Sequence, residues 1–86
     1  MSNDALDFKI KAIAATIRNK REQRNYTQEY LAAKLDISQN AYSKIELGYT
    51  KITIERLFQI ADVLEYDVTE LINTSAADRL KMARVG

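Results

Sequence analysis

Apolar side chains recur along this chain at intervals of three and four residues, the spacing that places them on one face of an α-helix. The first such pattern predicts a helix over residues 8–24. Its apolar face is made of Ile10, Ile13, Ala14 and Ile17. Arg21 falls on the same face, where an unpaired charge is unusual, and the helix is followed by Asn25, which tolerates the left-handed conformation of a helix end.

Two short helices with a tight turn between them are predicted over residues 27–48. Thr27 caps the first of them, and Ser38 caps the second after a turn at Asp36 and Ile37. The buried residues of the first are Leu31, Ala32 and Leu35. The residues of the second that are expected to face the core are Ala41, Tyr42 and Ile45. The remaining residues form an outward face of Gln39, Asn40, Ser43, Lys44 and Leu47.

Two more helices and a tail complete the predicted fold, which is all-α. Thr53 caps a fourth helix and Asp67 caps a short fifth helix. The residues of the fourth helix that are expected to point inward are Ile54, Leu57, Phe58, Ala61 and Leu64, and the fifth helix contains Val68, Leu71 and Ile72. Proline is absent and glycine occurs only at positions 48 and 86, so no flexible linker divides the chain. We therefore expect a flexible N-terminus over residues 1–7, one domain over residues 8–72, and a tail over residues 73–86 that is either helical or disordered.

The composition excludes several kinds of site. The 86 residues include no cysteine and no histidine, so disulfides and thiolate metal sites are absent. A catalyst of this size would have to work with carboxylates, lysines and tyrosines alone, so we expect no enzyme and no cofactor. No apolar run is long enough to span a membrane, and the N-terminus lacks the basic-then-apolar pattern of a signal peptide. We expect a soluble cytoplasmic protein.

Charges are distributed unevenly along the chain, although the net charge is only +1. Between positions 9 and 24, a single acid, Glu22, accompanies six cations: Lys9, Lys11, Arg18, Lys20, Arg21 and Arg24. Between positions 53 and 72, a single cation, Arg56, accompanies five carboxylates: Glu55, Asp62, Glu65, Asp67 and Glu70. This separation is expected of a protein with one end turned toward DNA, and it is equally compatible with solvated helix faces that bind nothing.

Several short motifs between positions 10 and 72 keep a fixed order and spacing. They are Ile17-Arg18-x-x-Arg21, Thr27-Gln28-Glu29-x-Leu31-Ala32, Ile37-Ser38, Ile45-Glu46-x-Gly48, Leu57-x-x-Ile60-Ala61-x-x-Leu64 and Glu70-Leu71. This set resembles the Cro and phage-repressor family of helix-turn-helix proteins, also called the xenobiotic-response-element (XRE) class. The resemblance implies a compact five-helix, lambda-repressor-like bundle in which residues 38–47 form the helix that enters the DNA major groove.

The chain departs from the family pattern at several turns. Asn25, Asp36 and Glu65 stand where the family usually has glycine, and Ile52 stands where it often has proline. Asparagine and aspartate reach positive φ at modest cost, so the first two departures are expected to keep the same turn. Glu65 is less suited to that conformation and indicates a different local cap. None of these positions lies on the expected DNA-facing surface.

The outward face of the third helix carries side chains suited to reading bases. Gln39 and Asn40 can each bond an adenine edge bidentately, and Lys44 can reach a guanine edge or a phosphate. Ser43 is small enough to contact a base or a phosphate. The family resemblance implies base contacts at these same positions. The alternative is a polar helix face that meets only water.

Other residues around this face are expected to contact DNA phosphates, which position a protein before bases are read. They are Gln28, Ser38, Arg18, Tyr49, Thr50 and Lys51. Gln28 opens the second helix, where its side chain and the free amides of the helix can meet one phosphate. The resemblance implies the same role for Gln28. It also implies that Arg21 and Glu46 form a structural ion pair that holds the third helix in register, rather than a DNA contact.

Together these residues predict a sequence-specific double-stranded DNA-binding transcriptional regulator, either a dimeric repressor or an autoregulator. One such domain contacts about one half-site, so we expect a homodimer on a two-fold symmetric operator. The dimer interface is expected on the fifth helix and the tail, unless the same residues close the core: Leu71, Ile72, Leu80 and Met82. The alternative function is an antitoxin-like or adaptor protein whose main partner is another protein. Neither a small-molecule ligand nor a membrane is indicated as a partner.

Overall fold

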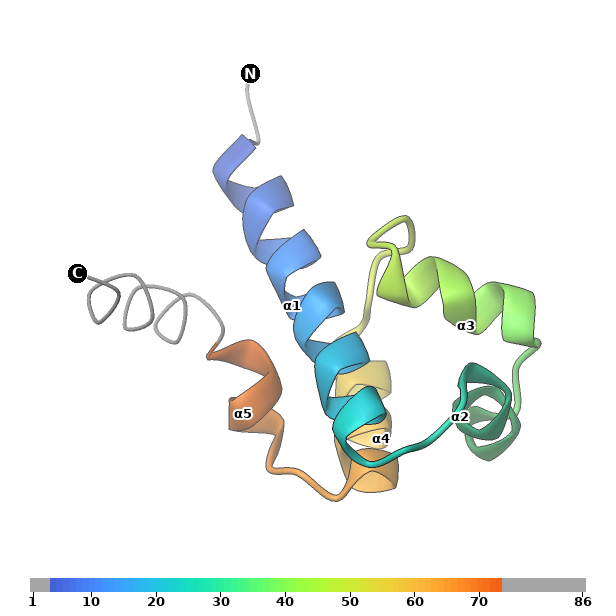
Figure 1. The fold of residues 1–86 in the computed structure, drawn as a ribbon. Helices are drawn as coiled ribbons and strands as arrows, with labels where there is room; N and C mark the ends of the chain where they lie inside the picture. Colours follow the sequence, from blue (N-terminus) through green and yellow to red (C-terminus); the bar gives the residue numbers. More distant parts are fainter. Residues whose placement is uncertain (1–3, 74–86) are drawn as a thin grey trace.

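The structure is a bundle of five helices arranged around the first. The computed structural model describes residues 4–73, and that part of the chain contains no strand. The helices are α1 (Asp4–Gln23), α2 (Gln28–Leu35), α3 (Gln39–Glu46), α4 (Ile54–Leu64) and α5 (Val68–Ile72). In Figure 1, α1 runs through the middle, α4 lies behind its C-terminal half, α5 lies on one side, and α2 and α3 lie on the other. The predicted all-α bundle is confirmed.

The core draws side chains from all five helices. The largest fully buried ones are Ile17 of α1, Leu31 of α2, Tyr42 of α3, Ile60 and Leu64 of α4, and Leu71 of α5. Burying an apolar side chain of this size stabilises the fold by about 1.5–3 kcal/mol. Each helix is therefore held by its own apolar stripe. Leu71 closes the core, which was one of the two roles expected for it.

The first helix begins earlier than predicted. It starts at Asp4 rather than at residue 8, so residues 4–7 are helical instead of belonging to a flexible N-terminal segment. Asp4 and Asp7 lie in the first turn, where carboxylates interact favourably with the positive end of the helix dipole. The apolar stripe of Ile10, Ile13 and Ile17 extends back to Leu6 at the same helical spacing, a signal that the predicted boundary at residue 8 left out.

The inward face of α4 also differs from the prediction. Ile54 and Phe58 are 75% and 52% exposed, whereas Ile60 is fully buried. Two overlapping stripes, one through positions 54, 57, 58 and 61 and the other through 57, 60, 61 and 64, both have helical spacing. The way α4 packs against the other helices selects the second stripe. The first stripe leaves two large apolar side chains in water.

Four helices end in the same left-handed turn. The residues at positive φ are Asn25 (63°), Asp36 (61°), Gly48 (77°) and Glu65 (64°). At each turn the left-handed residue and the next one donate backbone hydrogen bonds into the last helical turn; at the end of α4, the N–H of Glu65 bonds Asp62 and that of Tyr66 bonds Ala61, both at 3.1 Å. At Gly48 space is also tight, because a Cβ there would lie 3.0 Å from Cγ of Lys11 and would displace that side chain slightly.

Glu65 adopts this turn rather than the different cap predicted for it. Arg24 supports the turn from the end of α1. Its Nε donates to the carbonyl of Leu64 and its Nη2 to the carbonyl of Glu65, each at 2.8 Å. Its guanidinium also lies 4.4 Å from the ring centroid of Tyr66. These contacts satisfy the last carbonyls of α4 and hold a conformation that glutamate alone disfavours.

The predicted N-caps are confirmed. Thr27, Ser38 and Thr53 each accept a hydrogen bond of 3.0 Å from the backbone N–H three residues later. Asp67 accepts hydrogen bonds from the backbone and the hydroxyl of Thr69, and these bonds hold the pKa of Asp67 below its ordinary value. The chain therefore marks the start of every helix after the first with an oxygen-bearing side chain.

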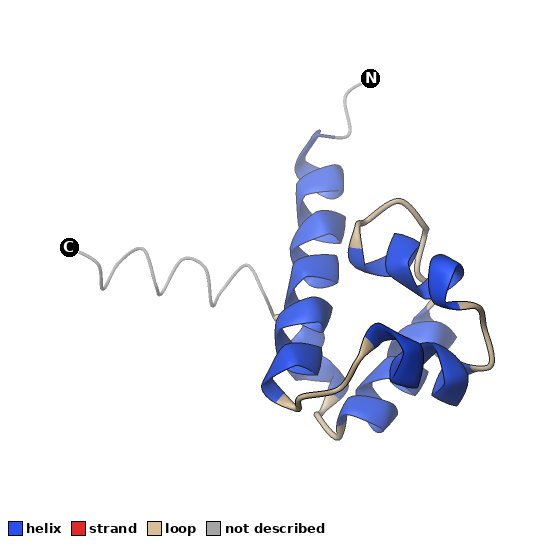
Figure 2. Ribbon diagram, turned by 45° about the vertical axis from the view of Figure 1, so that its right-hand side comes forward, coloured by secondary structure: helices blue, strands red, loops and turns tan. Residues whose placement is uncertain are grey.

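A connector of residues 47–53 joins α3 to α4 and is the most extended loop in Figure 2. It begins at the C-terminal end of α3 and passes beside the N-terminal half of α1. Residues 74–86, which include Leu80 and Met82 of the predicted tail, lie outside the described residues. Among the helices of residues 4–73, none combines the length and the apolar character needed to cross a membrane.

The left-handed turn at Glu65 predicts a stabilising substitution. An L-residue in this conformation costs about 1–2 kcal/mol, and glycine avoids that cost while losing about 0.5–1 kcal/mol through its greater freedom in the unfolded chain. We expect Glu65→Gly to raise the free energy of unfolding by about 0.5–1 kcal/mol in urea denaturation. The control is Glu55→Gly, in the first turn of the same helix, which is expected to lower it by about 1 kcal/mol. Equal losses in both variants would contradict the expectation.

Candidate nucleic-acid interface

The outer face of α3 is defined by what the opposite face buries. Tyr42, Ile45 and Glu46 point into the bundle, and Ser38 fixes the start of the helix. The outer face consists of half-buried Ser43 and of four exposed residues, Gln39, Asn40, Lys44 and Leu47. Ala41 is exposed rather than buried as predicted, because it lies at the edge turned toward the α3–α4 connector. No carboxylate lies on the outer face, since the single acid of α3 points inward.

One carboxylate ties α3 to α1 and α2. Arg21 donates from Nε to Oε2 of Glu46 at 2.6 Å and from Nη2 to Oε1 at 3.0 Å. Tyr42 donates to Oε2 at 2.5 Å, and Gln28 donates from Nε2 to Oε1 at 3.0 Å. Arg21 and Glu46 are both buried. The ion pair implied by the family resemblance is thus present, and a glutamine and a tyrosine join it.

These contacts keep the pair charged. Burial raises the pKa of Glu46, but the hydrogen bonds from Arg21, Tyr42 and Gln28 together lower it by more, so the pKa lies below its ordinary value. The hydrogen bond to Glu46 raises the pKa of Arg21 despite the opposite effect of burial. Burial, followed by the contact with Glu46, raises the pKa of Tyr42, which remains a hydrogen-bond donor.

Two of the residues predicted to bind phosphates have partners within the protein. Gln28 donates one amide hydrogen to Glu46 and retains a second one. Arg18 donates from Nε to Oε2 of Glu22 at 3.1 Å, between two side chains that are at least half exposed. Exposed pairs of this kind contribute little, so the guanidinium can exchange partners at small cost. Contacts of Gln28 and Arg18 with phosphates stay predictions.

Three cations of the basic first helix hold the bundle together. Arg21 bonds α3 and Arg24 bonds the end of α4. Lys20 lies with Nζ 4.6 Å from the ring centroid of Tyr66 and 3.9 Å from the carboxylate of Glu70. Contacts within the bundle therefore explain these three cations, although only Lys20 meets a carboxylate of the acidic segment. A DNA-facing role is not needed to explain them.

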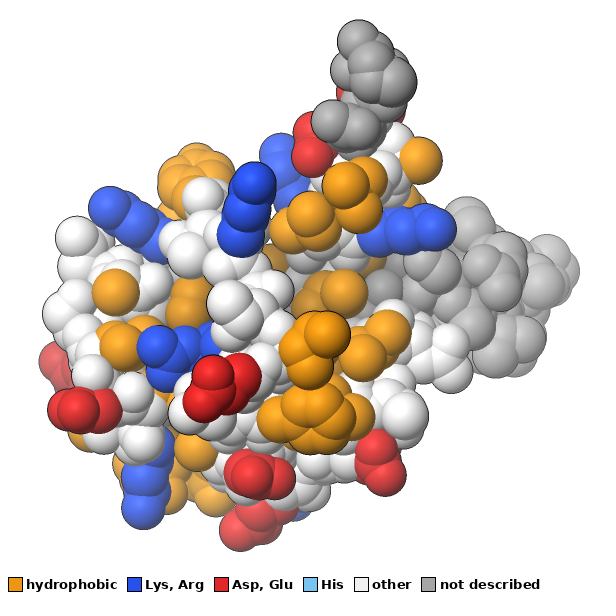
Figure 3. All heavy atoms as spheres, turned by 180° about the vertical axis from the view of Figure 1, so that it is seen from behind, with side chains coloured by type: hydrophobic (Ala, Val, Ile, Leu, Met, Phe, Trp, Pro, Cys, Tyr) orange, Lys and Arg blue, Asp and Glu red, His pale blue; other side chains and the backbone are white. Residues whose placement is uncertain are grey.

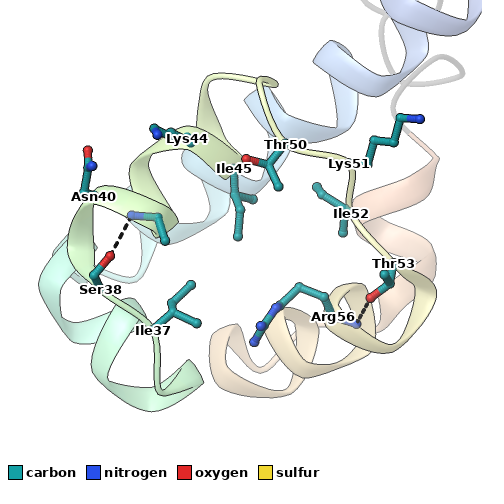
Figure 4. Close-up of a pocket in the computed structure, with 11 residues that line it drawn as sticks. Ile37, Ser38, Asn40, Lys44, Ile45, Thr50, Lys51, Ile52, Thr53 and Arg56 are labelled. Atoms are coloured by element: carbon teal, nitrogen blue, oxygen red, sulfur yellow. Dashed lines mark hydrogen bonds between the residues drawn. The ribbon is translucent and has the colours of Figure 1, made fainter.

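A hollow of about 520 Å³ lies between α3, the α3–α4 connector and the start of α4 (Figure 4). Lys44, Lys51 and Arg56 contribute positive charge to its lining, which contains no carboxylate. Ile37, from the turn between α2 and α3, and Ile45, from α3, point into the hollow on one side (Figure 4). Arg56 points into it from α4 on the other side. The hollow opens beside the outer face of α3, so its cations extend that surface toward α4.

Arg56 is a residue of this surface that sequence reasoning missed. Its Nη1 lies 3.4 Å from the carbonyl of Leu35, at the end of α2, and donates to Oε1 of Gln59 at 3.1 Å. The side chain thus reaches from α4 to the turn that precedes α3. The available signal was its position as the one cation in an otherwise acidic segment.

The surface suits a polyanion that also presents hydrogen-bonding edges. It combines the amides and the ammonium of α3 with Tyr49, Thr50 and Lys51, which are all exposed on the connector. Amide groups can both donate and accept, whereas lysine provides charge. Over residues 4–73, no group of three or more histidine, cysteine, aspartate or glutamate side chains is arranged to hold a metal ion.

Removal of Arg21 is expected to be far more harmful than removal of the arginine one turn earlier. Arg21→Ala leaves a buried carboxylate without its cation and is expected to lower the free energy of unfolding by about 3–5 kcal/mol. Arg18→Ala removes an exposed ion pair on the same helix and is expected to change it by no more than about 1 kcal/mol. Urea denaturation followed by circular dichroism measures both, and similar losses would contradict the structural role of the buried pair.

The pKa of Glu46 predicts how stability depends on pH. A carboxyl whose pKa is lower in the folded state stabilises the fold fully above its unfolded pKa, ordinarily 4.5, and this contribution is lost as the pH falls through the folded pKa. Between about pH 5 and pH 3, wild-type protein is therefore expected to lose stability more steeply than Glu46→Gln. The control Glu55→Gln, at an exposed site, should keep the wild-type slope. Parallel curves for wild type and Glu46→Gln would show that Glu46 gains nothing from its partners.

Comparison with known proteins identifies the family. A family model described as Helix-turn-helix matches residues 17–71. The cryptic phage CTXphi transcriptional repressor RstR of Vibrio cholerae serotype O1 is 38% identical over 66 residues, which make up 77% of this chain and 59% of that repressor. This chain therefore spans less than two thirds of the length of the relative.

Two solved structures share the fold. Both are crystal structures of the clp gene regulator ClgR from Corynebacterium glutamicum, with TM-scores of 0.75 and sequence identities of 23% and 24%. The similarity covers 81% and 90% of this chain and 91% and 88% of those chains. The matched family model includes both helices of the motif and the Arg21–Glu46 pair that fixes them to α1, and the chain belongs to the Cro and phage-repressor family of helix-turn-helix proteins.

Proposed function

We propose that the chain is a sequence-specific double-stranded DNA-binding transcriptional regulator, a dimeric repressor or autoregulator that reads the major groove with α3. The outer face of α3 carries this proposal, because it exposes amide and ammonium groups while the one carboxylate of the helix is turned inward. The major groove of B-DNA admits an α-helix. Family membership and a relative named as a transcriptional repressor support regulation rather than catalysis. Such a protein would act on DNA in the cytoplasm.

Base reading is assigned to the N-terminal part of α3. Gln39 and Asn40 follow the cap directly, in the part of a recognition helix that reaches base edges. Each amide can pair with the N6 and N7 positions of adenine. Lys44 follows one turn later and can reach a guanine edge, and Ser43 lies between them as a small donor and acceptor.

Phosphate contacts are assigned to two flanks of α3. On the side of α1 and α2 they are Gln28 and Arg18, together with Ser38 at the start of α3. On the side of α4 they come from the connector, through Tyr49, Thr50 and Lys51. Each flank would contact the phosphates of one of the two DNA strands that border the groove. Such backbone contacts fix the register of a helix in the groove.

Selection from a randomised duplex library tests this proposal. The purified chain is expected to retain a two-fold symmetric motif with half-sites about ten base pairs apart. Asn40→Ala is expected to lose about 1–3 kcal/mol of discrimination at one base position in each half-site. Arg18→Ala is the matched control, because loss of a phosphate contact should weaken binding to all sequences about equally and reduce the log–log salt slope by about 0.9 per site.

Two outcomes would contradict the proposal. An unchanged motif with Asn40→Ala would show that the outer face of α3 is not the reading surface. A retained pool without any common motif, from protein that circular dichroism shows to be folded, would exclude sequence-specific DNA binding. The second outcome would favour the antitoxin-like or adaptor function, in which the main partner is another protein.

A further inference from the structure

An apolar surface lies on the side of the bundle away from α2, where α4 meets the N-terminal half of α1. Its centre is a groove of about 360 Å³ between the two helices, lined by Leu6, Ile10, Ile13, Lys51, Ile52 and Leu57. Ile54 and Phe58 of α4 flank Leu57 at helical spacing and are 75% and 52% exposed. Figure 3 shows hydrophobic side chains gathered on this side of the molecule. We call this surface, from Leu6 to Phe58, the α1–α4 patch.

The patch is large enough to form the apolar centre of an interface with another macromolecule. A large apolar or aromatic side chain has about 150–250 Å² of surface, so the exposed fractions of Leu6, Ile54 and Phe58 correspond to about 300–400 Å² per molecule. The largest exposed apolar patch of a monomeric protein is about 300–600 Å² and is often functional. Two copies joined through it would bury about 600–800 Å² of apolar surface. A polar rim then brings the total to the roughly 1,000 Å² of a specific interface.

We propose that the α1–α4 patch is the interface of a two-fold symmetric homodimer in which the α4 helices of two copies pack antiparallel. A two-fold interface must be self-complementary, with each contact made twice. In this arrangement Ile54 packs on the partner's Phe58, and Phe58 packs on the partner's Ile54. One apolar pair repeated across the axis thus fills the centre of the interface.

The charges at the edges of the patch fit the same arrangement. Lys51, in the connector just before α4, lies at one end of the patch. Asp62 lies one turn beyond Phe58 on α4, at the opposite end of the patch. Both are exposed, and neither makes an ion pair within residues 4–73. When two α4 helices run antiparallel, the lysine of each copy approaches the aspartate of the other. Opposite charges at the rim favour this register over a parallel one, which would place like charges together.

The patch also has the location that a DNA-binding dimer requires. Lys51 lines both the groove of the patch and the cationic hollow beside α3, so the connector forms the boundary between the two surfaces. An axis through the patch brings the two connectors together and places one α3 on each side of them. Two recognition helices separated in this way can enter successive turns of the groove. This part of the inference rests on the proposed function.

Sedimentation equilibrium of the full chain without DNA tests the interface. Wild-type protein is expected to be dimeric at micromolar concentration, and Phe58→Asp is expected to raise the dimer dissociation constant at least about 100-fold, because it places two carboxylates in an apolar contact. Ile72→Asp is the comparison variant, since Ile72 is 50% exposed on α5, where the sequence predicted the dimer interface, and lies outside the patch. It should remain dimeric. Ile54→Ser provides a milder second variant should Phe58→Asp fail to fold.

Each outcome bears on the interface separately from DNA binding. A wild-type protein that is still monomeric at about 100 µM, where a dimer with a micromolar dissociation constant would be almost fully associated, would overturn the inference. So would a dimer that survives both patch variants, or one that Ile72→Asp dissociates. A dimer that dissociates in the patch variants but selects no DNA motif would support the interface and overturn only the proposed function. If the Phe58→Asp variant is folded and monomeric, still prefers the wild-type half-site sequence, and has lost affinity for the two-fold site, both the interface and the proposed function are supported.

Discussion

The carboxylate of Glu46 is removed from water and yet stays charged, because four hydrogen bonds from three helices converge on it. Arg21 supplies the compensating charge, and Tyr42 and Gln28 complete the hydrogen bonding. Apolar contacts alone could hold α3 against the bundle in several rotations about its axis. A two-pronged ion pair fixes one of them, because its hydrogen bonds depend on direction. The residues that face outward from α3, and therefore any surface for DNA, follow from this one buried group.

The starts of the four helices after α1 and the outer face of α3 could be predicted because local chemistry determines them. Hydroxyl and carboxyl caps mark the helix starts, and Tyr42 and Ile45 fix the side of α3 that is buried. The face of α4 could not be predicted, since Leu57 belongs to two stripes of equal spacing and only packing selects between them. The turn at Glu65 depends on Arg24, which is 41 residues away in the sequence. Long-range contacts also made part of the candidate site unpredictable. The guanidinium of Arg56, for example, approaches the carbonyl of Leu35, which only the tertiary fold brings near.

The connector between α3 and α4 divides two surfaces of opposite character. On one side lies the cationic hollow that continues the outer face of α3, and on the other lies the α1–α4 patch. Lys51 and Ile52 line both hollows, so the connector is shared by the two surfaces. Gly48 begins this loop against the side chain of Lys11. Its φ of 77° favours glycine, and a larger residue at this position would also require the Lys11 side chain to move.

The exposed residues on the outer face of α3 are not packed against any other element in residues 4–73. The neighbours of this face across the hollow leave it unpacked, and its position is secured from behind by Glu46. Replacing an exposed side chain that packs against nothing usually changes stability by no more than about 0.5 kcal/mol. Mutations can therefore accumulate at Asn40 or Lys44 without endangering the fold. Under the proposed function, single substitutions on this face could therefore change the target sequence, whereas the half of the helix that carries Glu46 tolerates few changes.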